Sequence, residues 1–147
     1  MKKIALLLLT VITISCGNDR HELTSADMQG QWKTLQGKAS RKTPLRDVEP
    51  CEGGKFKGEI YTLNADGSFS TKEICSGKPP EDTQKNRWKY EDHILTMEHT
   101  YKGSDTKNVY SVSDMGDGKV KWKLLYSRYN YEYNLEDTGY YLVMKKQ

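Results

Sequence analysis

The chain has 147 residues, of which 29% are charged and 35% are hydrophobic, and its formal net charge at pH 7 is +3. Because 20 acidic residues nearly balance its 23 basic ones, it lacks the concentrated positive charge with which proteins bind nucleic acid. A single domain is the expectation for this length.

The first segment has the layout of an export signal. Lys2 and Lys3 precede an apolar run, Ile4 to Ile14, which is followed by Ser15 and Cys16. This run of about eleven residues is far shorter than the roughly 20 that a membrane-spanning helix needs. We therefore expect residues 1–15 to be a signal peptide that is removed. Its loss would leave 21 basic residues against 20 acidic ones, and so a formal charge of +1.

A small residue directly before a cysteine, here Ser15-Cys16, resembles the lipobox of bacterial lipoproteins. The resemblance implies that the chain is cut before Cys16 and that Cys16 carries the lipid. It also implies a location in the bacterial cell envelope, anchored in the outer membrane and facing the periplasm or the exterior. Residues 16–27 are mostly polar and are expected to form a flexible tether, which leaves residues 28–147 for the folded domain.

The folded region begins with one short helical turn and continues as strands. The turn is expected over residues 24–28, with Thr24 or Ser25 as its cap. Strands are indicated by β-branched and aromatic residues between turn signals such as Asn64-Ala65-Asp66-Gly67. The expected strands are Gly30 to Gln36, Phe56 to Leu63, Ser68 to Ile74, Asn86 to Glu91, Ile94 to His99, Val109 to Ser113, Val120 to Tyr126 and Tyr140 to Lys145.

Short turns between these strands favour an antiparallel meander. Apolar residues alternate with polar ones, as in Trp88-Lys89-Tyr90, which is typical of a sheet with one buried face. A sheet of this kind has two exposed edges, and closing it into a barrel removes both. We therefore predict an all-β domain, an eight-stranded antiparallel up-and-down barrel.

The order of several short motifs resembles the bacterial lipocalin-like lipoproteins. Gly30-Gln31-Trp32 is similar to the G-x-W that begins the first lipocalin strand. A strand that runs into Asn64-Ala65-Asp66-Gly67 and then Phe69 follows, and later strands contain Arg87-Trp88 and Leu95-Thr96. The resemblance implies a lipocalin-like barrel with a possible internal cavity.

Two cysteines remain once Cys16 is acylated. Cys51 and Cys75 would lie in an oxidising compartment, where a disulfide is the leading interpretation. A redox or metal-binding pair is the alternative, although two cysteines make only half of a zinc site.

The inward-facing residues of the later strands are the candidates for lining a ligand cavity: Trp88, Tyr90, Leu95, Met97, Trp122, Leu124 and Tyr126. The alternative is that these side chains fill the barrel, because eight strands enclose a space just wide enough for side chains to close it. In the family resemblance Trp32 plugs the closed end instead of touching a ligand.

No catalytic or metal-binding pattern stands out. His93 and His99 lie six residues apart on a strand-like segment, which on a straight strand is about 20 Å and too far for one metal ion. The sequence has no G-x-S-x-G motif and no glycine-rich phosphate loop, so we expect neither an enzyme nor a cofactor.

Two binding functions remain as hypotheses. The first is that the barrel binds a small hydrophobic or amphipathic molecule without catalysis. The second is that the protein binds another protein, as an inhibitor or immunity-type module, through loops 37–54 and 76–86 and the stretch Tyr129, Tyr131 and Tyr133.

Overall fold

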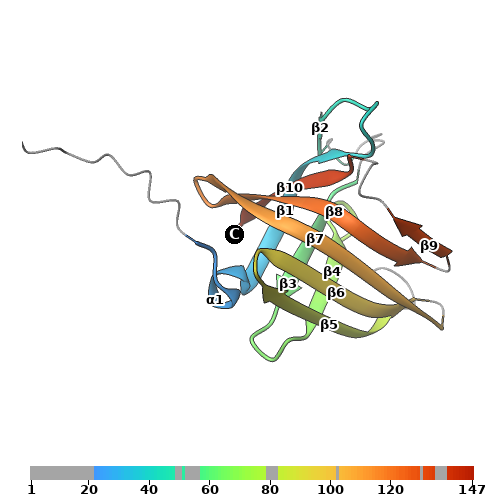
Figure 1. Cartoon of the computed structure of the whole chain (residues 1–147). Coiled ribbons are helices and arrows are strands. Elements are labelled where there is room, and N and C mark those ends of the chain that lie inside the picture. The colour runs from blue at the N-terminus through green and yellow to red at the C-terminus, as the bar shows by residue number, and fades with distance from the viewer. Residues whose placement is uncertain are drawn as a thin grey trace, which may run out of the picture.

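The computed structural model describes residues 22–48, 51, 57–78, 83–101, 103–129, 131–134 and 139–147. Over these residues the chain forms one short helix and ten strands (Figure 1). They are α1 (Ser25–Met28), β1 (Gly30–Lys38), β2 (Arg46–Asp47), β3 (Glu59–Leu63), β4 (Phe69–Glu73), β5 (Thr83–Glu91), β6 (Ile94–Tyr101), β7 (Ser104–Gly116), β8 (Lys119–Tyr129), β9 (Tyr131–Asn134) and β10 (Tyr141–Lys146).

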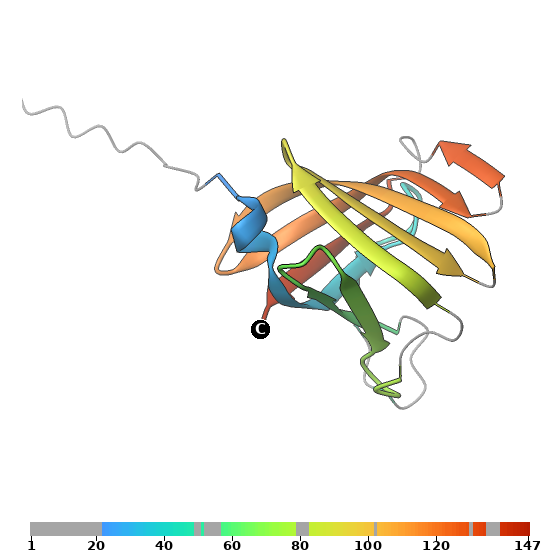
Figure 2. The same ribbon diagram turned by 90° about the horizontal axis from the view of Figure 1, so that it is seen from below.

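Eight of the described strands form a nearly closed antiparallel barrel, as the sequence predicts. Their order is β4-β3-β1-β10-β8-β7-β6-β5, while β2 pairs only with β1 and β9 only with β8. The last strand, β10, lies between β1 and β8, so the two ends of the domain share one ladder. Figure 2 shows the strands curled around a common interior, with α1 over one end and β9 at the other.

The barrel closes where β5 meets the turn between β3 and β4. The backbone N–H of Trp88 donates to the carbonyl of Gly67 at 2.8 Å, and its indole N–H donates to the carbonyl of Asn64 at 2.9 Å. Ser68 and Arg87 form an isolated bridge at the same place. The turn is tight because Gly67 adopts a φ of +78°, a left-handed conformation that glycine accepts without strain.

Each of the eight expected strands is present, but some bounds differ. β7 covers Ser104–Gly116, whereas only Val109 to Ser113 was expected, since its polar flanks pair through their backbones. The expected long loop over residues 37–54 is also shorter. β1 continues to Lys38, and β2 pairs with it, with the Gln36 amide donating to Asp47 at 2.7 Å. Backbone pairing needs no apolar pattern, which is why side-chain alternation underestimates these lengths.

Helix α1 covers one end of the barrel. Thr24 caps it as predicted, in a capping box with Asp27. Met28 is fully buried, and its carbonyl accepts a hydrogen bond from the Trp32 indole at 2.7 Å. Leu23 also packs against the core, so from Glu22 onward the expected tether lies on the barrel. In the described part of the chain, no helix has the length and apolar character to cross a bilayer.

A disulfide joins Cys51 to Cys75, with the two Cα atoms 5.1 Å apart. This confirms the leading interpretation of the cysteine pair. The bond joins the segment before β3 to the residues just after β4. It therefore restrains the β3–β4 hairpin, which forms one edge of the nearly closed barrel. Cys16 lies outside the described residues.

Replacing Cys51 and Cys75 together by serine should lower the free energy of unfolding by about 3 kcal/mol, because the bond closes a loop of roughly 25 residues in the unfolded chain. Urea denaturation followed by tryptophan fluorescence measures the change. Reducing the disulfide of the unmodified protein should lower the urea midpoint by about as much as the double substitution does. An unchanged midpoint in both experiments would contradict a stabilising role for the bond.

Candidate ligand site inside the barrel

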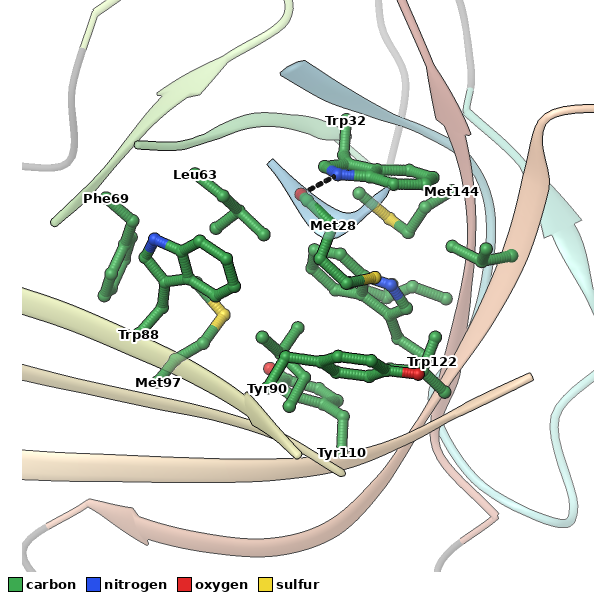
Figure 3. Packing of buried hydrophobic residues seen from close by; sticks show 14 of the residues in the cluster. Met28, Trp32, Leu63, Phe69, Trp88, Tyr90, Met97, Tyr110, Trp122 and Met144 are labelled. Atoms are coloured by element: carbon green, nitrogen blue, oxygen red, sulfur yellow. Dashed lines mark hydrogen bonds between the residues drawn. The ribbon is translucent and has the colours of Figure 1, made fainter. Parts of the chain in front are cut away.

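The half of the interior next to α1 is filled with apolar side chains. Six of the seven predicted cavity residues are buried in one cluster: Trp88, Tyr90, Leu95, Met97, Trp122 and Leu124. Figure 3 shows Trp122 at the centre of this cluster with Met28 and Tyr110 around it. The Trp32 and Trp122 rings lie 6.2 Å apart at a tilted angle of 52°. In this half the side chains fill the barrel, as the second interpretation of the sequence holds.

The seventh predicted residue, Tyr126, lies on the outer face. The pairing of β7 with β8 shifts register between Val109 and Tyr110, so that Val109 opposes Tyr126 and Tyr110 opposes Leu124. Tyr110 is buried in the core, so its neighbour Val109 points outward, and Tyr126 points the same way. The expected alternation through Tyr126 is therefore wrong, because a β-bulge adds one residue and reverses the faces beyond it.

The other half of the interior is lined by polar side chains. His99 and Thr106 oppose one another on β6 and β7, on the same inner face as the buried Met97. Next to them the Ser127 hydroxyl donates to the Asn108 side-chain carbonyl at 2.6 Å. The barrel interior thus changes from apolar near α1 to polar at the end where β9 lies.

Several buried polar atoms in this interior have no hydrogen-bond partner among the described residues. They are Asn86 Oδ1, Tyr90 Oη, His99 Nδ1, Thr106 Oγ1 and Trp122 Nε1. An unpaired buried polar atom costs about 1–3 kcal/mol, so native proteins usually give such atoms a partner. Three of the five line the polar half. A small molecule with its own donors and acceptors would find partners there.

A carboxylate that accepts a hydrogen bond from a tyrosine lies at the border between the two halves. Tyr61 donates its hydroxyl hydrogen bond to Glu59, which precedes it by two residues on β3. The Glu59 backbone is fixed by Thr34, whose hydroxyl donates to the Glu59 carbonyl at 2.9 Å. The Tyr61 ring meets Trp122 edge-on, with centroids 5.3 Å apart. This cluster therefore contacts the apolar core on one side.

The tyrosines of this cluster remain protonated at neutral pH. Burial, and then the negative charge of Glu59, raises the pKa of Tyr61 well above its usual value. The same two causes raise the pKa of Tyr140 to about 12, and burial raises that of Tyr110 further still. Their hydroxyl groups are thus neutral donors around a carboxylate.

Glu59 and its tyrosines are not among the site residues that the sequence pattern predicts. Glu59, Tyr61 and Leu63 share one face of β3 by strand alternation, so the pattern could have placed Glu59 inward with the buried Leu63. Tyr110 and Tyr140 come from distant strands, and only the folded sheet brings them to Glu59.

The two histidines are apart. His93 lies in the turn between β5 and β6 with a φ of +62°, directly before the strand expected from Ile94, and its Nε2 is 3.6 Å from Glu22. His99 faces the interior, edge-on to Phe69, and burial lowers its pKa. Over the described ranges no three His, Cys, Asp or Glu side chains gather in a way that would hold a metal ion.

Two adjoining grooves run over the outer face of β5 to β8. Their volumes are about 460 Å³ and about 360 Å³, and Arg87, Glu98 and Lys107 line both. Lys107 pairs with Glu98 at 3.0 Å, and Tyr126 and Arg128 border the smaller groove. These grooves carry mixed charge, in contrast to the interior.

Comparison with known proteins adds no assignment to this geometry: no family model matches the chain, and no curated protein or solved structure matches it either.

The raised tyrosine pKa values predict a late phase in an alkaline titration. We expect the Tyr140 hydroxyl to ionise near pH 12, whereas an unperturbed tyrosine ionises near its usual value of 10.0. Because the folded state holds this proton more tightly than the unfolded one, the free energy of unfolding should fall as pH rises from 10 toward 12. Tyrosinate absorbance and urea denaturation at each pH measure the two effects.

Tyr140→Phe should remove one late-ionising group from that titration, and Glu59→Gln should shift the late phase to lower pH because the nearby negative charge is gone. A titration in which every tyrosine ionises together in the folded protein would contradict the buried cluster.

Proposed function

We propose that this chain is a lipid-anchored protein of the bacterial envelope whose barrel binds a small amphipathic molecule without catalysis. The observation that carries the proposal is the division of the interior into a filled apolar half and a polar half. In the polar half the side chains of Asn86, His99 and Thr106 hold buried atoms without partners. A molecule with its polar group among these side chains and its apolar body toward the apolar half matches that division.

Cys16 is the residue that we propose carries the lipid, and its place in the chain limits how far the barrel can lie from the membrane. Only six peptide units separate Cys16 from Glu22, the first described residue, and an extended chain of that length reaches about 20 Å. Leu23 and α1 then pack on the barrel. An acylated Cys16 would therefore hold the α1 end close to the bilayer and turn the polar end away from it. A ligand would enter from the aqueous side.

The proposal also includes kinship with the lipocalin-like lipoproteins. It is supported by the eight-stranded barrel and by the place of the G-x-W motif in it. Gly30 takes a φ of +110° at the start of β1, and Trp32 packs at the covered end of the barrel, where the resemblance puts it.

A second function, protein binding, is favoured by the outer grooves. Arg87, Glu98, Lys107 and Arg128 are successive neighbours across β5 to β8, which makes a polar row along an otherwise regular surface. The expected tyrosine contact surface falls on the β8–β9 hairpin, where Tyr131 opposes Tyr129.

Ligand binding is tested by titrating the protein with dodecanol and an environment-sensitive hydrophobic dye while recording tryptophan emission. We expect a shift in emission, because Tyr61 at the border of the site meets the Trp122 ring edge-on. Thr106→Phe should abolish the shift by occupying the polar half with a larger side chain. Val109→Phe is the matched control, since Val109 lies nearby on β7 but faces outward. Equal binding by both variants would contradict an interior site.

The anchor is tested by Cys16→Ser. We expect the variant to lose acyl labelling and to leave the detergent phase, or to accumulate as an uncut precursor, because serine offers no thiol for the lipid. Each buried methylene of an acyl chain contributes about 0.8 kcal/mol, so the loss should be evident in partitioning. A variant that still takes up acyl label would contradict the anchor.

A further inference from the structure

Two glutamates face each other inside the barrel. Glu59 on β3 and Glu73 on β4 are direct partners across the two strands. The same ladder pairs Leu63 with Phe69, and both of those side chains lie in the core. Counting back by twos along each strand places Glu59 and Glu73 on that inner face too. Both are half-buried, so the pair lines the interior while keeping access to solvent.

Like charges directly opposite one another destabilise a sheet unless something compensates them. The Tyr61 hydroxyl donates to Glu59, and the Ser76 hydroxyl donates to Glu73 at 3.1 Å. These neutral donors satisfy carboxylate oxygens without cancelling charge. Over the residues that the structure describes, no lysine, arginine or histidine forms an ion pair with either glutamate.

Tyrosines lie near one member of the pair, Glu59. Tyr61, Tyr110 and Tyr140 are close enough to Glu59 for its charge to raise the pKa of each hydroxyl. Tyr61 and Tyr110 also lie beside the Trp122 ring, at centroid distances of 5.3 Å and 5.9 Å. The negative face of an aromatic ring attracts a cation, and it does so most strongly where water is excluded.

We propose that the polar half of the barrel binds the positively charged head group of an organic amine or quaternary ammonium compound. The head group would lie between the Glu59 and Glu73 carboxylates and the tyrosine rings. Its apolar body would lie against the tyrosine rings at the border of the apolar half. This inference rests on the proposed binding function and specifies its ligand class.

A metal ion fits the same groups less well. Two carboxylates fall short of the six to eight oxygen ligands typical of calcium. Aromatic rings contribute nothing to such a shell, whereas they stabilise an alkylammonium group by cation–π contact. An anionic head group is disfavoured because it would meet two carboxylates.

The test compares three probes with the same alkyl chain and different head groups. These are dodecyltrimethylammonium, dodecanol and dodecanoate, titrated into the full chain and followed by tryptophan emission and calorimetry. The two ionic probes are kept below their micelle concentrations, and dodecanol is kept below its solubility limit. We expect the ammonium probe to bind at least about tenfold more tightly than dodecanol, and dodecanoate to bind most weakly. The ammonium probe should also raise the thermal midpoint.

Glu59→Gln and Glu73→Gln should each bring the ammonium affinity down toward that of dodecanol while leaving the dodecanol affinity unchanged. Glu98→Gln, on the outer face, is the matched control and should keep the preference. Since each inner substitution removes a like-charge pair, both variants should fold, with thermal midpoints at or above that of the unmodified protein.

The two levels of the proposal fail in different ways. Equal binding of all three probes, or a preference that survives both inner substitutions, would overturn the cationic ligand while leaving the binding function in place. Tightest binding of dodecanoate would overturn it as well. If no probe binds, the binding function fails, and the cationic ligand fails with it.

Discussion

Closure of the barrel depends on the contact between Trp88 and the turn that joins β3 to β4. The strand order leaves β4 and β5 as the two end strands of the sheet, and they meet at a single bridge. Trp88 adds a backbone and an indole hydrogen bond to carbonyls of that turn, so one residue joins the two sides twice. Because the indole ring is also buried in the core, the same side chain closes the barrel and fills it.

Apolar side chains fill the barrel interior only at the end that α1 covers. Trp32 bonds to the last carbonyl of α1, and Met28 enters the core from that helix, so the helix and the first strand close the same end together. The opposite end has no equivalent helix among the described residues. Its inner face carries Glu59, Glu73, Asn86, His99 and Thr106. Covering these polar side chains with apolar ones would cost a large desolvation free energy. The asymmetry of the interior is the basis for regarding it as a binding site and not only as a core.

The outer face of the barrel carries a row of charged side chains. Beyond the bulge near Leu124, Tyr126 and Arg128 point outward beside Val109 and Lys107, which extends a charged row across four strands. The charges in this row are partly paired, as between Lys107 and Glu98, and each exposed pair contributes little to stability. Charged side chains on an edge strand such as β5 also discourage pairing with other chains. Among the described residues the inner glutamates form no such ion pairs, and that difference is why the interior carries the functional proposal.

Local chemistry is what the sequence determined by itself. The helical turn capped by Thr24, the tight turn at Gly67, the eight strands and the inward alternation of Trp88, Tyr90, Leu95 and Met97 all depend on neighbours within a few residues. The disulfide could be anticipated as well, since only two cysteines remain beside Cys16. The lengths of the strands could not be predicted as well from the sequence, because backbone pairing continues into polar segments, such as those that begin at Ser104 and Arg46.

Only the tertiary structure decided the registers and what they bring together. One bulge placed Tyr126 outside, although its spacing from Trp122 and Leu124 suggested the interior. The pairing of β3 with β4 set Glu59 opposite Glu73, and the curvature of the sheet brought Tyr110 and Tyr140 to the same carboxylate. A shift of one residue in any of these ladders would turn the side chains to the other face. Register is set by the balance of all the ladder and core contacts at once, so no local segment of the chain encodes it.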